Sequence, residues 1–156
     1  MKSMKTVVGI ALLALSSAAF AGSSVVLDLT TQRYDADKNY NENNLGAGYA
    51  FETTTKYTGD IEAQVGFFHN EDDRTSVYAR ATKYLMTTSV VDHQVRLGVQ
   101  AGVATGYDRA NLVATVAGVA NVKLSDRVSF NVLVSPYREN GDTKAQVGAQ
   151  LQFALK

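Results

Sequence analysis

Residues 94–105 decide the fold of this chain, and they read Gln94-Val95-Arg96-Leu97-Gly98-Val99-Gln100-Ala101-Gly102-Val103-Ala104-Thr105. Every second residue from Val95 to Val103 is apolar, and the residues between them are arginine, glutamine or glycine. This period of two is typical of a β-strand whose two faces meet different surroundings. The same alternation recurs in segments 60–69 and 143–155, so the pattern predicts a sheet protein.

Clusters of Asn, Asp, Gly, Ser and Lys divide the chain into eight such segments. Most segments hold the roughly 9–11 residues with which a tilted strand crosses a bilayer. Segment 111–121 is apolar on both faces, so its alternation does not show which face points inward. The single proline, Pro136, is expected at a strand end, where a missing N–H is tolerated. The predicted strands are residues 23–32, 44–52, 60–69, 75–85, 94–105, 111–121, 127–136 and 143–155.

Composition excludes several classes of protein. The chain has 156 residues, enough for one domain, and its 15 basic residues match its 15 acidic residues. Without a basic excess, nucleic acid is not an expected partner. The absence of cysteine excludes disulfides and thiolate metal sites. His69 and His93 are expected at opposite ends of the fold, so no metal site and no cofactor is predicted.

Residues 1–21 are typical of an export signal. They combine Lys2 and Lys5 with an apolar stretch over residues 7–15 and end in Ala19-Phe20-Ala21. A membrane anchor is the alternative, but the apolar stretch is shorter than the roughly 20 residues of a spanning helix. Cleavage is therefore expected after Ala21. Residues 22–156 would form the mature domain, with 13 basic and 15 acidic residues once two lysines are removed from 15.

Alternation alone does not show which face is inside, because a soluble ligand-carrying barrel and a transmembrane barrel both alternate. The polar face is rich in glycine, which suits the narrow interior of an eight-stranded barrel. We therefore expect an all-β, eight-stranded antiparallel up-and-down transmembrane barrel, with both termini in the periplasm and a filled lumen. Ordinary solvent exposure is the alternative for its charged residues. The expected lumen network is Asp28, Glu62, Arg80, Arg96 and Gln100.

Aromatic residues gather near the ends of the predicted strands, as in the girdles of membrane barrels. The outer girdle is expected to contain Phe67, Phe68, Tyr78, Tyr107 and Tyr137. The inner girdle is expected to contain Tyr49, Phe51, Tyr57, Tyr84, Phe130 and Phe153.

The chain ends in a pattern that resembles the assembly signal of bacterial outer-membrane barrels. Gln146 and Gly148 precede the alternating hydrophobic residues Leu151 and Phe153, and three further residues follow. With the export signal and eight strands, the mature chain resembles the small outer-membrane barrels: the OmpX and attachment-invasion type, the OmpA transmembrane domain, and the lipid A palmitoyltransferase and deacylase. Segments such as Gly66-Phe67-Phe68-His69-Asn70 also resemble uncharacterised barrels of phage and proteobacterial genomes.

The resemblance implies a Gram-negative outer-membrane protein, delivered by the barrel-assembly machinery and surrounded by lipids and lipopolysaccharide as a monomer. A non-enzymatic surface protein that binds lipopolysaccharide, a host or a phage through its outer loops is the leading expectation. A lipid-modifying enzyme is the second, because His69, Ser76 and Asp72 lie in one predicted hairpin and contain the groups of a nucleophilic triad. A soluble periplasmic barrel and a small pore are the remaining alternatives.

Overall fold

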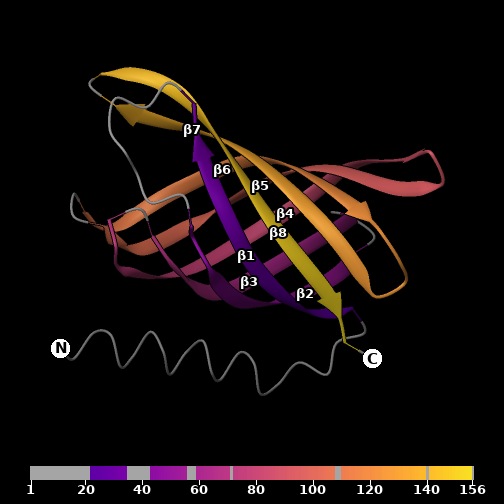
Figure 1. Ribbon diagram of the computed structural model, residues 1–156. Helices are drawn as coiled ribbons and strands as arrows, with labels where there is room; N and C mark the ends of the chain where they lie inside the picture. The colour runs from indigo at the N-terminus through magenta and orange to yellow at the C-terminus, as the bar shows by residue number, and fades with distance from the viewer. Residues whose placement is uncertain are drawn as a thin grey trace.

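The computed structural model describes residues 22–34, 43–55, 59–70, 72–107, 110–139 and 141–155. Eight strands follow one another along the chain, each antiparallel to the next, and β8 pairs with β1 to close a barrel (Figure 1). This confirms the predicted all-β, up-and-down architecture. The described residues include no helix that could cross a membrane. The strands are β1 (Ser23–Arg33), β2 (Gly46–Thr55), β3 (Gly59–His69), β4 (Thr75–Val90), β5 (His93–Tyr107), β6 (Ala110–Lys123), β7 (Val128–Glu139) and β8 (Asp142–Ala154).

The strands are strongly staggered around the barrel. A row of paired residues that starts at Val113 on β6 returns to the same strand at Lys123, ten residues further along. Closure with such a stagger tilts the strands, by roughly 35–45° in barrels of this kind. The row passes through Val113, Ala104, Tyr78, Gly66, Gly48, Val26, Gln152, Ser129 and Lys123.

Polar side chains fill the inside of the barrel and apolar side chains cover its outside. Glu62 is 1% exposed and lies among buried glutamine, asparagine and threonine side chains. Along β5, Gln100 is buried, whereas its neighbours Val99 and Val103 are exposed. This is the reverse of a soluble barrel, in which the apolar face forms the core. The exposed apolar residues of the strands are Phe67, Leu85, Met86, Val90, Leu97, Val99, Val103, Leu112, Val116 and Val134.

Glycines make room for one large ring in the lumen. A Cβ placed on Gly66 would lie 2.7 Å from Cζ of Tyr78, and a Cβ on Gly48 would collide with the tyrosine hydroxyl. Tyr78 is 2% exposed and reaches across these two strands from β4. Alternating glycine and long polar residues therefore reflects side chains that interlock in a narrow interior.

The aromatic assignment from sequence is partly wrong. Phe68, Tyr78 and Tyr84 are buried on the lumen side instead of belonging to the girdles, and Tyr107 packs against Phe68 and Tyr78 and lines the cavity there. Phe68, Tyr78 and Tyr84 have the same inward phase as the polar residues on β3 and β4. The girdle prediction used only the position of each aromatic residue near a strand end, which does not show its phase. Phe67 is 55% exposed on the outer surface, as a girdle residue requires. Tyr57 lies outside the described residues.

Two strand features differ from the sequence interpretation. The structure gives β6 a phase, with Ala117 and Val119 buried and Val116 exposed. The inward-facing apolar residues of β6 form an apolar patch on the lumen wall together with Leu133 of β7. Pro136 lies inside β7 and not at its end, three residues before Glu139.

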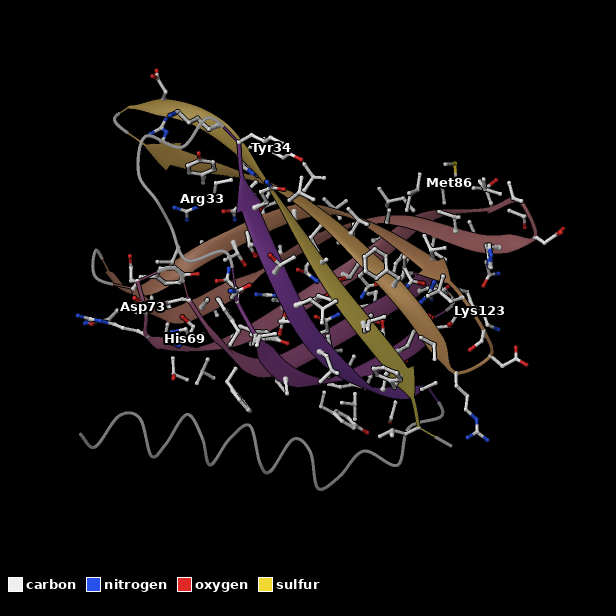
Figure 2. All side chains as sticks on the ribbon, viewed as in Figure 1. Arg33, Tyr34, His69, Asp73, Met86 and Lys123 are labelled. Carbon is white, nitrogen blue, oxygen red and sulfur yellow. The ribbon has the colours of Figure 1, made fainter. Side chains whose placement is uncertain are left out.

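The two ends of the barrel are unlike. We call the end that holds Ser24 and its β8 partner Ala154 the terminal end, and the opposite end the far end. At the terminal end the β4–β5 hairpin extends beyond its neighbours, because the last described β3–β4 pair there is Ile61 with Lys83, while β4 continues to Val90. This extension projects from the barrel at the right of Figure 1, and it contains Met86, labelled in Figure 2.

Candidate functional site

The far half of the lumen is organised around Asp28. Its carboxylate accepts hydrogen bonds from the Tyr78 hydroxyl at 3.1 Å and from Gln150 Nε2 at 2.6 Å, and Arg80 Nη1 lies 3.7 Å away. The Arg80 guanidinium also stacks over the Tyr78 ring at 3.9 Å. Four residues from β1, β4 and β8 are thus joined across the lumen, where a charge needs such partners.

A second ion pair lies nearer the terminal end. Arg96 Nη1 contacts Glu52 Oε1 at 2.6 Å, and Arg96 Nε donates to Asn121 at 3.2 Å. The guanidinium lies over the Tyr84 ring, 4.0 Å from its centre. Charge-assisted contacts of this length are the stronger kind of hydrogen bond, so this cluster ties β2, β5 and β6 together.

Glu62 lies between the two ion pairs and is held by amides. Its two carboxylate oxygens accept from Gln64 Nε2 and Gln152 Nε2, each at 2.7 Å. Gln100 donates to Thr82 Oγ1 at 3.0 Å on the neighbouring strand. All five residues expected in the lumen therefore lie inside the barrel.

Several lumen residues were missed by the sequence interpretation. They are Glu52, Tyr78, Asn121, Asn131, Gln150 and Gln152, and all carry hydrogen bonds of the network. Most of them have the same inward phase as the lumen glycines. This shared phase is the sequence signal that could have identified them.

A cavity of about 100 Å³ lies between this network and the far end. Its lining combines the polar side chains of Arg80, Gln100 and Gln150 with the apolar side chains of Ala117 and Leu133. Its volume exceeds the roughly 10–15 Å³ that one water molecule needs.

The structure does not bring His69, Ser76 and Asp72 together as a triad. Ser76 is fully buried on the lumen side and accepts a hydrogen bond from Asn70 Nδ2 at 3.0 Å. His69 pairs with Thr75, one position out of phase with Ser76, so its imidazole lies on the outer side. There Nε2 is 3.3 Å from Asp73 Oδ1. Both residues are labelled at the left end of the barrel in Figure 2. Successive residues of a strand face opposite sides of the barrel wall. His69 and Ser76 therefore lie on different sides, although they belong to the same hairpin.

Asn70 is the organising residue of that hairpin. Its side-chain oxygen accepts from the backbone N–H groups of Asp72 and Arg74, at 3.0 and 2.9 Å. Its amide nitrogen donates to Ser76 Oγ and to the Gly106 carbonyl at 2.9 Å. An asparagine that satisfies turn N–H groups in this way fixes the turn, so the loop is rigid at its base.

Arg33 and Tyr137 contact each other at the far end of the barrel. The guanidinium lies 4.6 Å from the centre of the Tyr137 ring, and Arg33 Nε donates to Gln146 at 3.2 Å. The Tyr137 hydroxyl donates to the Tyr34 carbonyl at 3.0 Å. Arg33 and Tyr34 lie beside β7 and β8 at the upper left of Figure 2. Residues 35–42, which follow Tyr34, lie outside the described residues.

The four residues of the expected assembly signal lie on β8, which closes the barrel. Gln146 and Gly148 have lumen-facing partners on β1, and Gln146 donates to Ser135 at 2.9 Å. Leu151 and Phe153 have the opposite phase, toward the outer surface. The pattern thus marks the strand that pairs with β1.

Together these features define a closed eight-stranded barrel with a filled polar interior and an apolar outer surface. No protein-family model matches the chain, and no curated protein matches it. Among solved structures, it is similar to the Yersinia pestis outer membrane protein Ail in a phospholipid bilayer nanodisc. That match has 12% sequence identity and a TM-score of 0.42, and it covers 84% of this chain and 98% of Ail.

Proposed function

We propose that this protein is an outer-membrane barrel of a Gram-negative host. The observation that carries the proposal is the inverted distribution of side chains, with buried carboxylates and amides inside and exposed valine, leucine and phenylalanine outside. Burying apolar area against lipid is favourable, by roughly 25 cal/mol per Å² removed from water. A closed barrel also leaves few unpaired backbone groups, as a membrane span requires.

The orientation follows from export through the inner membrane. Residues 1–21 would be removed after Ala21, which leaves both ends of the barrel domain in the periplasm and the far end at the cell surface. The Cys-free chain allows a direct test with Asp72→Cys at the far end and Asp126→Cys at the terminal end. An impermeant maleimide added to intact cells should label only Asp72→Cys. Labelling of Asp126→Cys alone would reverse the orientation.

At the surface, the protein acts through its far-end loops as a non-enzymatic binding protein. A filled lumen disfavours a pore, and the separation of His69 from Ser76 disfavours a hydrolase. The far end presents Arg138 and Arg74 beside acidic residues, a combination that suits phosphate groups and the divalent ions that bridge them. Lipopolysaccharide carries such phosphates on the same leaflet, and a host or phage partner is the other class of ligand.

Binding of lipopolysaccharide to the refolded protein tests this role. Arg138→Glu should weaken binding several-fold, whereas the matched charge reversal Arg127→Glu at the terminal end should leave it unchanged. Equal loss in both variants would indicate nonspecific charge effects and contradict the proposal. No binding by the wild-type protein would favour a host or phage partner. A changed acyl pattern of lipid A in expressing cells, abolished by His69→Ala, would instead favour the enzyme.

A further inference from the structure

Arg80 is a lumen cation whose hydrogen bonding is incomplete. Its side chain is 12% exposed, and its guanidinium carbon lies 3.9 Å from the centre of the Tyr78 ring and 5.6 Å from that of the Phe68 ring. The two rings hold the group by cation–π attraction. The Asp28 carboxylate, at 3.7 Å, is beyond hydrogen-bonding distance. Within the described part of the chain, no residue therefore accepts a hydrogen bond from Arg80.

The other lumen arginine has partners of its own. Arg96 donates to Glu52 at 2.6 Å and to Asn121 at 3.2 Å. A guanidinium carries five N–H donors, and a buried donor without an acceptor is unfavourable. Arg80 is thus the arginine whose donors remain for an acceptor that lies outside the described chain.

Arg80 lines the cavity of about 100 Å³ in the far half of the lumen. Ser135 lines the same cavity, and its Oγ accepts a hydrogen bond from Gln146 at 2.9 Å, so its own O–H can donate to a ligand. The apolar side chains of Ala117 and Leu133 complete the lining. The cavity therefore joins hydrogen-bond donors to an apolar surface.

The far half of the lumen also carries an excess of positive charge. Arg33 pairs with Gln146, and Lys144 lies two residues before Gln146, so both have its inward phase. Up to the level of Lys144, the described inward-facing side chains of this half include three cations, Arg33, Lys144 and Arg80, and one carboxylate, Asp28. A cleft with charge of one sign attracts ligands of the opposite sign. The ligand expected here is an anion.

We propose that this cavity binds a short-chain carboxylate of about the size of acetate. A guanidinium presents parallel N–H groups that match the two oxygens of a carboxylate. The apolar lining suits the alkyl part of such a ligand, which inorganic phosphate lacks. At about 100 Å³ the cavity is smaller than the roughly 150 Å³ that accommodates benzene, so it has room for a ligand of roughly four non-hydrogen atoms.

This site lies inside the barrel, apart from the far-end loops proposed to bind lipopolysaccharide, so the inference goes beyond the proposed function. Titration of ¹³C-labelled acetate into the protein in detergent micelles, at constant ionic strength, tests it by the line broadening of the acetate resonance. The wild-type protein should broaden the acetate resonance, and an excess of unlabelled propionate should reverse the effect. Inorganic phosphate at the same concentration should not reverse it.

Three variants locate the site. Arg80→Lys keeps the charge but loses the parallel N–H groups, so acetate affinity should fall by about tenfold, the effect of one charged hydrogen bond. Ala117→Leu should abolish binding because it fills the cavity and changes no charge. Arg96→Lys is the matched control, since Arg96 does not line the cavity, and its acetate affinity should equal that of the wild-type protein.

Four outcomes would overturn the inference. The first is no acetate binding by the wild-type protein, which would leave water as the content of the cavity. The second is competition by phosphate as strong as that by propionate, which would exclude recognition of the alkyl part. The third is an equal loss in Arg80→Lys and Arg96→Lys, and the fourth is unchanged binding by Ala117→Leu. If Arg80→Lys does not fold, Ala117→Leu gives the same decision. Because the measurement needs neither a bilayer nor lipopolysaccharide, its outcome is independent of the proposed function.

Discussion

At the scale of single residues, the lumen is held by side chains that fit around one another and by charges that have partners. Tyr78 illustrates both, because two glycines make space for its ring while the Asp28 carboxylate accepts a hydrogen bond from its hydroxyl group. A residue can therefore be essential here through its small size. Gly66 and Gly48 have ordinary backbone angles, so their role is to leave space where any other residue would place a Cβ.

Gly66→Ala should destabilise the barrel. The new methyl group would lie 2.7 Å from the Tyr78 ring and from backbone atoms of β2, so rings and strands must shift, at a cost of roughly 1–3 kcal/mol for overpacking. Gly118→Ala is the matched control, since only the Val134 carbonyl lies within 4 Å of its Cβ, at 3.9 Å. Urea unfolding in detergent micelles measures both, and equal stability of the two variants would refute the interlocking of Tyr78 with glycine.

The pair of Arg96 and Glu52 should show strong coupling in a double-mutant cycle. Arg96→Met leaves the Glu52 carboxylate without its cation in the lumen. We expect a loss of about 2 kcal/mol, below the roughly 3–5 kcal/mol of a fully buried pair because both groups are partly exposed. Adding Glu52→Gln should restore most of this stability. Additive losses in the urea midpoints would show that the two groups do not act as a pair.

At the scale of strands and hairpins, alternation in the sequence predicts the elements and their order well, but not the phase of every strand or the extent of its pairing. All eight expected strands are present, and the phases of β3, β5 and β8 follow directly from their residues. Sequence cannot phase β6, because small apolar residues suit both lipid and an apolar lumen patch. It also cannot show that β6 and β7 part beyond Gly118, since that depends on the closure of the whole barrel.

The hairpin between β4 and β5 carries backbone strain at its tip. Val91 and Asp92 have φ angles of 45° and 66°, as in the two-residue turns that favour asparagine and glycine. A β-branched residue is unfavourable there, so Val91→Asn should stabilise the protein by about 1 kcal/mol. Val90→Asn, one residue earlier, should give no such gain. Thermal unfolding of both variants checks this, and equal shifts would mean that strain at residue 91 has no effect.

At the scale of the whole molecule, the candidate site was harder to predict than the fold. Asp28, Glu62, Arg80, Arg96 and Gln100 share the inward phase, so sequence places them in one lumen. Their partners depend on the ten-residue stagger of the strands, which joins Gln150 to Asp28 and Glu52 to Arg96. The triad hypothesis joined His69 to Ser76 by closeness in sequence alone, and the pleat of the strands separates them.

The central claim is that the apolar face of the barrel contacts lipid and the polar face fills its centre. Nitroxide labels on single cysteines at positions 95 to 103 of β5, with the protein folded into vesicles, test it most directly. Collision with oxygen, which concentrates in the bilayer, should be high at positions 95, 97, 99, 101 and 103 and low at the positions between them. High collision rates at the even positions, or a protein that stays in the aqueous phase without detergent or lipid, would contradict the account.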